Sequence, residues 1–136
     1  MRAMLVFNPF ATSTSESIKN QIFEQLRDEF NVTLKPTASR GEATAIATQA
    51  LIEGFDVVIG YGGDGTMNEI ANGLLSAGVQ PSGPVLGAIP GGNANVFARN
   101  LEFSSNPLEA THQLIDSIQN DRKKTIGVGF LTSTNL

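Results

Sequence analysis

The chain has 136 residues, of which 40% are hydrophobic and 16% charged, a balance typical of one globular domain and not of a disordered chain. Its net charge is −4 and its pI about 4.8, so it has no excess of basic residues for binding nucleic acid. The absence of cysteine excludes disulfides, thiolate metal sites and cysteine nucleophiles. Since no apolar run reaches the roughly 18 residues of a membrane span, and Asn8-Pro9 comes too early for a signal peptide, we expect a cytoplasmic protein.

The chain begins with a predicted strand and a predicted helix. Residues 3–7, AMLVF, are typical of a buried strand. Ser13 and Glu16 have the spacing of a capping box, which predicts that the helix begins there. Apolar residues between 18 and 30 then repeat on one helical face.

The same alternation continues through the middle of the chain. Residues 31–35 predict a second strand that Pro36 stops. Residues 43–51 have the apolar spacing of a second amphipathic helix. The continuous apolar run at 56–60 favours a strand covered on both faces, and residues 67–75 predict a third helix.

The last third predicts two more strands with a helix between them. Residues 85–89 form the fourth strand, about 107–120 a helix, and 123–130 a further strand. The Gly/Pro-rich segment 76–84 is typical of a connection between a helix and a strand, not of a domain boundary. We therefore treat residues 1–136 as one domain.

Strands separated by helices of this length predict parallel pairing with right-handed crossovers, and hence an α/β three-layer sandwich, α/β/α, with a mostly parallel sheet. Ligands in such sheets bind beyond the carboxyl ends of the strands. Polar or glycine-rich segments occupy those ends, at residues 8–15, 36–41, 61–66 and 90–95. We expect the four loops to converge on one crevice.

The segment VVIGYGGDGTMNE, residues 57–69, contains two overlapping motifs. Gly60, Gly62 and Gly65 have the G-x-G-x-x-G spacing of a dinucleotide-binding turn. That turn normally follows the first strand of its unit, whereas this one follows the third. The next strand also lacks the acid, about 20 residues on, that holds a ribose hydroxyl. The carboxylate of Asp64 would also repel an incoming pyrophosphate. These observations disfavour NAD as the ligand.

The second motif is G-G-D-G-T, which suits phosphate transfer. Glycines let backbone N–H groups approach phosphate oxygens at the positive end of the following helix. Asp64 could then orient Mg²⁺ beside the phosphates or assist removal of a proton from an acceptor hydroxyl. Structural roles remain open, because Thr66 and Glu69 have the spacing of a capping box and Asp64 suits a turn.

Three ordered motifs resemble one family. GGDGTMNEIANGLL, residues 62–75, closely resembles the catalytic-domain signature of diacylglycerol kinases and the related sphingosine and ceramide kinases. Asn8-Pro9 is similar to that family's opening motif, and LGAIPGGNANVFARNL, residues 86–101, resembles its second signature. NAD kinases and phosphofructokinases also carry G-G-D-G-T, but the NAD kinase pattern lacks the pair seen here as Asn68-Glu69.

The resemblance implies the N-terminal nucleotide-binding domain of proteins like NAD kinase and diacylglycerol kinase. It places ATP on the glycine loop, with Mg²⁺ as the second cofactor, and makes Asp64 the candidate catalytic residue. No residue is assigned as a metal ligand. The residues it marks for nucleotide binding are Asn8, Thr37, Gly62, Gly63, Asp64, Gly65, Thr66, Met67, Asn68, Glu69, Gly92 and Asn93.

The sequence departs from the family pattern Pro-x-Gly-Thr-x-Asn-Asp-Phe-Ala-Arg at two positions. Asn93 stands where the family has threonine, and an asparagine can still exchange hydrogen bonds with phosphate or ribose. Val96 stands at the family's aspartate, which removes a carboxylate. We expect altered nucleotide contacts and an altered choice of substrate.

The family's kinases have a second, β-rich domain, which supplies much of the lipid site, the general base and structural Mg²⁺ ligands; this chain resembles only the first domain. We therefore expect a fragment of a lipid kinase that binds ATP, is inactive alone, and belongs to phospholipid metabolism. Its expected partners are nucleotide and a lipid such as diacylglycerol, with transient contact at the inner membrane face and an undetermined oligomeric state. The alternatives are a nucleotide-sensing module without catalysis and an NAD kinase-like phosphotransferase.

Isolated charged residues offer weaker signals. Arg40 and Arg99 could each meet a phosphate, although Arg99 also suits the C-terminal end of a short helix. His112 lies within a predicted helix and away from the crevice loops, so we expect a surface residue. The cluster at 121–124, DRKK, is small for a lipid-headgroup site and is typical of a solvated edge.

Overall fold

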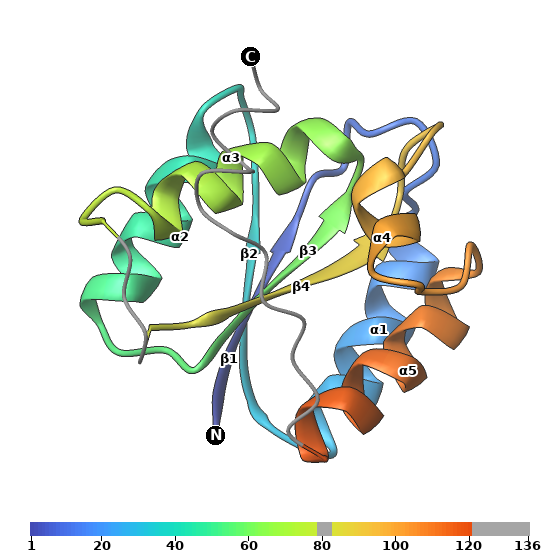
Figure 1. Cartoon of the computed structure of the whole chain (residues 1–136). Coiled ribbons are helices and arrows are strands. Elements are labelled where there is room, and N and C mark those ends of the chain that lie inside the picture. Colours follow the sequence, from blue (N-terminus) through green and yellow to red (C-terminus); the bar gives the residue numbers. More distant parts are fainter. Residues whose placement is uncertain (79–82, 121–136) are drawn as a thin grey trace.

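The computed structural model describes residues 1–78 and 83–120, which form three layers (Figure 1). The middle layer is a sheet of four parallel strands in the order β2-β1-β3-β4. The strands are β1 (Arg2–Phe7), β2 (Asn31–Pro36), β3 (Val57–Gly62) and β4 (Val85–Pro90). The helices are α1 (Glu16–Arg27), α2 (Glu42–Ile52), α3 (Asp64–Leu74), α4 (Val96–Asn100) and α5 (Pro107–Gln119). The predicted α/β/α sandwich is confirmed.

The sheet separates two hydrophobic cores. Helices α1 and α5 cover one face, and α2 and α3 cover the other (Figure 1). The first core contains Leu5, Ile22, Leu26, Ile59 and Leu114, and the second contains Met4, Val6, Ala47, Val58 and Ile70. Because β3 is central and covered on both faces, it is buried at every position, which explains its continuous apolar run.

Helices α2 and α3 approach each other closely at Gly73. A Cβ atom built on Gly73 would collide with the carbonyl oxygen of Thr44 and would lie 2.7 Å from the Cβ of Ala47. The hydroxyl of Thr44 donates a hydrogen bond to the carbonyl oxygen of Glu69 (2.9 Å), which lies one turn before Gly73 on α3. The absence of a side chain at Gly73 therefore sets the separation of these helices.

The predicted start of the first helix is wrong. Ser15, and not Ser13, caps α1, since its Oγ accepts a hydrogen bond from the N–H of Ile18 (3.1 Å). The N–H of Ser13 instead donates to the carbonyl oxygen of Gly91 (2.8 Å), in the loop after β4. A contact distant in sequence thus draws Ser13 out of the helix and moves the cap by two residues.

The predicted capping box in the third helix is also wrong. Strand β3 continues to Gly62, so α3 begins at Asp64 with Gly63 as its N-cap residue. Thr66 and Glu69 consequently lie inside the helix, where they cannot form the box.

Parts of the sequence-based prediction lie outside the described residues. These are the strand at 123–130, the cluster at 121–124 and the middle of the connection 76–84. Within the described ranges, no helix is long and apolar enough to cross a membrane.

Candidate functional site

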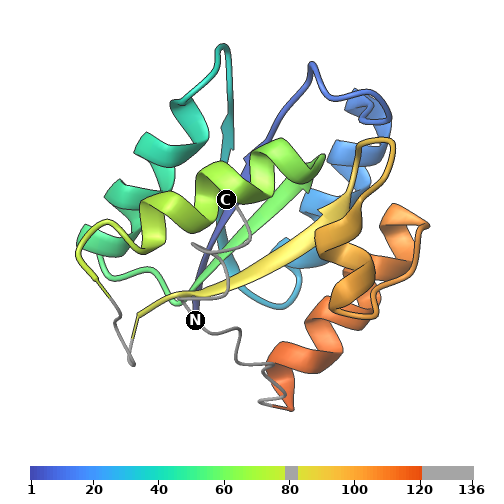
Figure 2. The same cartoon turned by 45° about the horizontal axis from the view of Figure 1, so that its top comes forward.

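The loops that follow the strands gather at one edge of the sheet, as the tilted view in Figure 2 shows. Backbone hydrogen bonds join the ends of three strands there. The N–H of Asn8 donates to the carbonyl oxygen of Tyr61 (3.1 Å), and the N–H of Thr37 donates to that of Phe7 (2.8 Å). Three of the four loops predicted to converge, those at 8–15, 36–41 and 61–66, line one crevice, whereas the loop at 90–95 contributes no residue to its lining.

The glycine loops after β3 and β4 lie in direct backbone contact. The N–H of Gly91 donates to the carbonyl oxygen of Gly62 (2.8 Å). A Cβ atom on Gly92 would lie 2.6 Å from the Cα of Gly63, and one on Gly91 would lie 3.0 Å from the Cα of Gly62. Glycine is needed here because another backbone occupies the space of a side chain.

A crevice of about 450 Å³ opens beside the glycine loops, between the end of β1, the loop after β2 and the start of α3. Its walls are polar at Asn8, Thr37 and Thr66, and cationic at Arg40. The lining residues are Asn8, Phe10, Thr37, Ala38, Ser39, Arg40, Ala43, Gly65, Thr66 and Glu69.

The crevice brings some of the predicted site residues together and leaves others outside it. Those that line it are Asn8, Thr37, Gly65, Thr66 and Glu69. Those outside its lining are Gly62, Gly63, Asp64, Met67, Asn68, Gly92 and Asn93. Met67 is 2% exposed and packs with Ala88 and Ala98, whereas the side chains of Asn68 and Asn93 are exposed.

Four lining residues were not predicted or singled out from the sequence as part of the site: Phe10, Ala38, Ser39 and Ala43. Phe10 follows directly after Asn8-Pro9, and 76% of its surface is exposed. The only feature of the sequence that could have indicated it is its position just after the first strand. Ser39 lies in the predicted loop after the second strand. Neither residue has a motif of its own that would single it out.

Asn8 and Thr66 both line the crevice and are bonded to each other. The Nδ2 of Asn8 donates a hydrogen bond to the Oγ1 of Thr66 (3.2 Å), while the Oδ1 of Asn8 accepts one from the N–H of Phe10 (2.9 Å). Thr66 is only 6% exposed. These bonds fix the orientation of both side chains at the start of α3.

Asp64 does not contact this pair. Its Oδ2 accepts a hydrogen bond from the N–H of Val96 and its Oδ1 accepts one from the N–H of Phe97, each at 2.9 Å. The carboxylate thereby joins the first residue of α3 to the first turn of α4. No feature of the sequence indicated this contact, because the groups are more than thirty residues apart.

Two further acids shape the loop after β2. The Oε1 of Glu69 accepts a hydrogen bond from the N–H of Gly41 (3.1 Å). Glu42 accepts one from the N–H of Ala38 and one from the hydroxyl of Ser39, each at 2.9 Å. The bonds from Ala38 and Ser39 hold the pKa of Glu42 below its usual range, because they favour the carboxylate.

The loop after β4 is closed by Asn95, which has a left-handed backbone with φ 50°. Its Oδ1 accepts a hydrogen bond from the N–H of Gly92 (2.9 Å), and its Nδ2 donates one to the carbonyl oxygen of Gly92 (2.8 Å). Asparagine tolerates this conformation because its short polar side chain bonds to nearby backbone. The loop therefore has a fixed shape.

The isolated residues are placed largely as expected. Arg99 lies in the last turn of α4, His112 is exposed on α5, and Arg40 lines the crevice. Within residues 1–78 and 83–120, no three His, Cys, Asp or Glu side chains gather as a metal site. The crevice thus offers hydroxyl, amide and cationic groups and the positive end of α3, which suit an anionic ligand. It also contains the carboxylate of Glu69, one oxygen of which accepts the N–H of Gly41.

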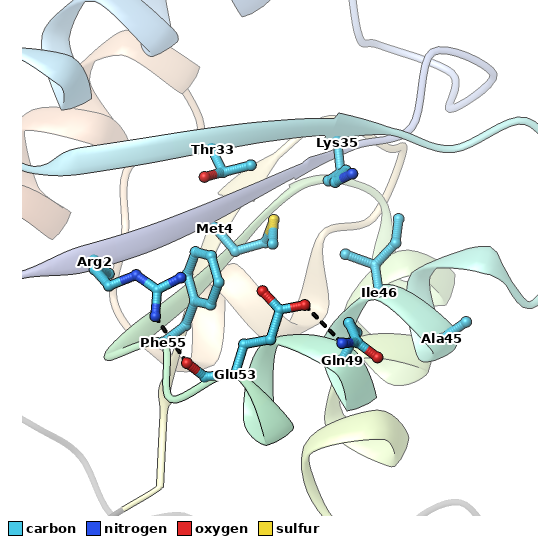
Figure 3. Close-up of a pocket in the computed structure, with 9 residues that line it drawn as sticks. All are labelled: Arg2, Met4, Thr33, Lys35, Ala45, Ile46, Gln49, Glu53 and Phe55. Atoms are coloured by element: carbon cyan, nitrogen blue, oxygen red, sulfur yellow. Dashed lines mark hydrogen bonds between the residues drawn. The ribbon is translucent and has the colours of Figure 1, made fainter.

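A separate groove of about 410 Å³ runs between α2 and the outer strand β2 (Figure 3). The guanidinium of Arg2 lies 4.0 Å from the centre of the Phe55 ring and donates to the carbonyl oxygen of Glu53 (2.8 Å). The side chain of Glu53 accepts a hydrogen bond from Gln49 (2.6 Å). This groove shares no lining residue with the crevice.

Comparison with known proteins assigns the family. The model of the diacylglycerol kinase catalytic domain matches residues 2–127. The chain belongs to this family. The resemblance noted in the three sequence motifs is therefore confirmed.

Diacylglycerol kinases are also among the similar proteins of known sequence and structure. That of Staphylococcus haemolyticus (strain JCSC1435) is 36% identical over 118 residues, and that of Staphylococcus aureus (strain bovine RF122 / ET3-1) is 34% identical over 119. The matches cover 84% and 85% of this chain but 34% and 36% of those proteins. The crystal structure of a diacylglycerol kinase from Bacillus anthracis strain Sterne matches with a TM-score of 0.76 and 30% identity, over 85% of this chain and 39% of that one.

Proposed function

We propose that this chain is the ATP-binding domain of a lipid kinase, which transfers the γ-phosphate of ATP to a hydroxyl of diacylglycerol or a related lipid. The observation that carries the proposal is the polar crevice beside the paired glycine loops, at the start of α3. Membership of the diacylglycerol kinase catalytic domain family supports the choice of a lipid acceptor.

The crevice residues suit a nucleotide. Backbone N–H groups at the start of α3 would bind phosphate oxygens, since the first turn of a helix has N–H groups without helical partners. Asn8, Thr37 and Thr66 would orient the nucleotide through hydrogen bonds, and the guanidinium of Arg40 would bind a phosphate. Gly62, Gly63, Gly92 and Asn93 would complete the surface beside it.

The carboxylate of Asp64 would help to hold Mg²⁺ when nucleotide is bound. A carboxylate has about four acceptor positions, and two of those on Asp64 are occupied by the amides of Val96 and Phe97. The remaining positions fit a cation or its water ligands. When bound, Mg²⁺ neutralises the charge that develops on the phosphate oxygens.

Turnover would require more than this chain. It spans about a third of the curated relatives that it matches, and we propose that the lipid site and the general base lie in the rest of such a protein. The isolated chain would then bind ATP without phosphorylating lipid. We further propose a cytoplasmic protein of phospholipid metabolism that visits the inner membrane face through its substrate.

A nucleotide-sensing module is the second candidate, and Val96 favours it. Val96 is 45% exposed at the start of α4, where the family pattern has an aspartate. If that carboxylate is needed for transfer, the chain would bind nucleotide without chemistry. In a protein that includes the remaining two-thirds, Val96→Asp should then raise diacylglycerol phosphorylation from background, whereas a kinase would already be active with Val96.

Thermal unfolding with ligands tests nucleotide binding directly. ATP at about 100 times its dissociation constant should stabilise the chain by roughly 2.7 kcal/mol, and Mg²⁺ should increase its affinity. Arg40→Ala should reduce this effect without changing the melting temperature of the free chain, and Asn72→Ala, exposed on α3, serves as the control. Stabilisation by NAD and not by ATP would contradict the proposal and favour the NAD kinase-like alternative.

A further inference from the structure

Both acids of the GGDGTMNE segment contact the starts of other helices. Asp64 accepts hydrogen bonds from the first two amides of α4, and Glu69 accepts one from the N–H of Gly41, the N-cap residue of α2. We propose that Asp64 and Glu69 are positioning residues that act before any ligand binds: Glu69 holds the loop after β2, which lines the crevice, and Asp64 holds the loop after β4 against the glycine loop beside it. The consequence for ligand binding rests on the proposed function.

Helices α2 and α4 lack caps of their own. Their N-cap residues are Gly41 and Asn95, and neither makes a side-chain capping bond. By contrast, Ser15 caps α1 and Asn106 caps α5 through their own side chains. The N–H groups at the start of a helix need hydrogen-bond acceptors. Two side chains of α3 supply them, Asp64 to α4 and Glu69 to α2.

Asp64 fixes the loop after β4, which packs against the glycine loop after β3 beside the crevice and contributes no residue to the crevice lining. Its two oxygens bind two consecutive amides, a charge-assisted arrangement that sets both the distance and the direction of α4. The loop that precedes α4 contains Gly91 and Gly92, which press against Gly62 and Gly63. The contact of Asp64 therefore keeps the second glycine loop against the first.

Glu69 fixes the loop after β2, which forms one wall of the crevice. Gly41 has φ 91°, so the chain turns sharply there, next to Ser39 and Arg40 on the crevice wall. The backbone of Glu69 is itself anchored, because its carbonyl oxygen accepts the hydroxyl of Thr44. The crevice wall formed by the loop after β2 is thus anchored to α3 through Glu69, and the glycine loop after β4 is anchored to α3 through Asp64.

Replacing each carboxylate by the corresponding amide should affect the two contacts differently. In Asp64→Asn one oxygen becomes an NH₂ group that faces a backbone N–H, so one of the two bonds is lost and replaced by an opposed pair of donors. In Glu69→Gln the remaining amide oxygen can still accept the single bond from Gly41. Glu69→Ala removes that bond altogether.

Amide hydrogen exchange, measured by NMR on the ligand-free 136-residue chain, tests the positioning role. Asp64→Asn should speed exchange at Val96 and Phe97 by about tenfold or more, without an equal change at Gly41. Glu69→Ala should speed exchange at Gly41 alone, and Glu69→Gln should stay within about threefold of wild type.

The exchange rate of the Ile18 amide, which donates a hydrogen bond to the Oγ of Ser15, is the internal reference. Unchanged exchange at Val96 and Phe97 would overturn the role of Asp64, and unchanged exchange at Gly41 in Glu69→Ala would overturn that of Glu69. Equal acceleration at Ile18 would also overturn the proposal, because the variant would then loosen the whole chain.

ATP affinity with excess Mg²⁺ and with EDTA distinguishes positioning from metal binding. A positioning role predicts that Asp64→Asn weakens ATP affinity by about tenfold even with EDTA, where no metal contributes, because the glycine loops beside the crevice shift in either condition. Loss confined to the Mg²⁺ condition would assign Asp64 to the metal and overturn our inference. Failure of the wild-type chain to bind ATP would contradict the proposed function, while the exchange result would still decide the positioning role.

Discussion

Single residues at the crevice edge differ in what surrounds them, even when they are of one type. Gly92 has the backbone of Gly63 within 2.6 Å of the place of a Cβ atom, whereas Gly65 has no atom within 4 Å. Both belong to motifs that a sequence comparison treats alike. Their substitution should therefore have different physical effects.

We expect Gly92→Ala to lower the free energy of unfolding by about 1–3 kcal/mol, because the new methyl group forces two backbones apart. Gly65→Ala should leave stability unchanged or raise it by up to about 1 kcal/mol, since it adds a helix-favouring residue in open space on α3. Urea unfolding followed by circular dichroism measures both. Equal destabilisation by the two variants would contradict the packing of the loops.

Glu42 predicts a pH dependence. Hydrogen bonds from Ala38 and Ser39 lower its pKa in the folded state from the usual 4.5. Their contribution to stability is therefore fully present above about pH 4.5, and it is lost as the pH falls through the lowered folded value. Glu42→Gln should flatten the decline in unfolding free energy below pH 4.5 relative to wild type, and an NMR titration of Glu42 should give a midpoint below 4.5. A midpoint above that value would contradict the prediction.

At the scale of elements, the crevice depends on how α2 is placed against α3. The helices touch at Gly73, where the carbonyl oxygen of Thr44 takes the space of a side chain. Glu69 lies one turn earlier on α3 and bonds to Gly41 at the start of α2. Helix separation and the shape of one crevice wall are therefore linked.

Gly73→Ala should destabilise the chain by about 1–3 kcal/mol, because the methyl group would overlap backbone that cannot rotate away. The matched control is Asn72→Ala, a substitution at the neighbouring exposed position of the same helix. The difference between their midpoints in urea measures the cost of the close crossing. A Gly73→Ala variant as stable as Asn72→Ala would show that the helices can separate freely.

The order and type of the elements could be predicted because apolar periodicity is a local property of the sequence. The continuous run in β3 and the spacing of 43–51 each indicated the right element. The start of α1 could not be predicted, since the N–H of Ser13 bonds to Gly91 far along the chain. The partners of Asp64 were equally inaccessible, because the motifs place residues near the carboxyl ends of the strands but do not show which of them line the crevice or bond to one another.

At the scale of the whole molecule, one sheet is shared by two cores. Leu26 belongs to the core beneath α1 and α5, and Ile70 belongs to the core beneath α2 and α3. Both residues are fully buried, and each core rests on alternate side chains of β1 and β3. The two halves should consequently unfold together.

Leu26→Ala and Ile70→Ala should each lower the unfolding free energy by about 2–5 kcal/mol and keep a single transition. Fluorescence of Tyr61, the only tyrosine in a chain without tryptophan, reports the sheet, while far-UV circular dichroism reports the helices. The two signals should have coincident midpoints in each variant. Separate midpoints would show that the layers unfold independently.

The backbone contact between the two glycine loops also limits which substitutions can accumulate at these glycines during evolution. A side chain acquired at Gly63, Gly91 or Gly92 needs a compensating shift in the facing loop, and one at Gly62 would meet the side chain of Thr66, so none of these positions changes independently of its neighbours. Asn93, exposed and outside that contact, can change by itself. The chain departs from its family's pattern at Asn93 and retains glycine at all four points where the loops meet.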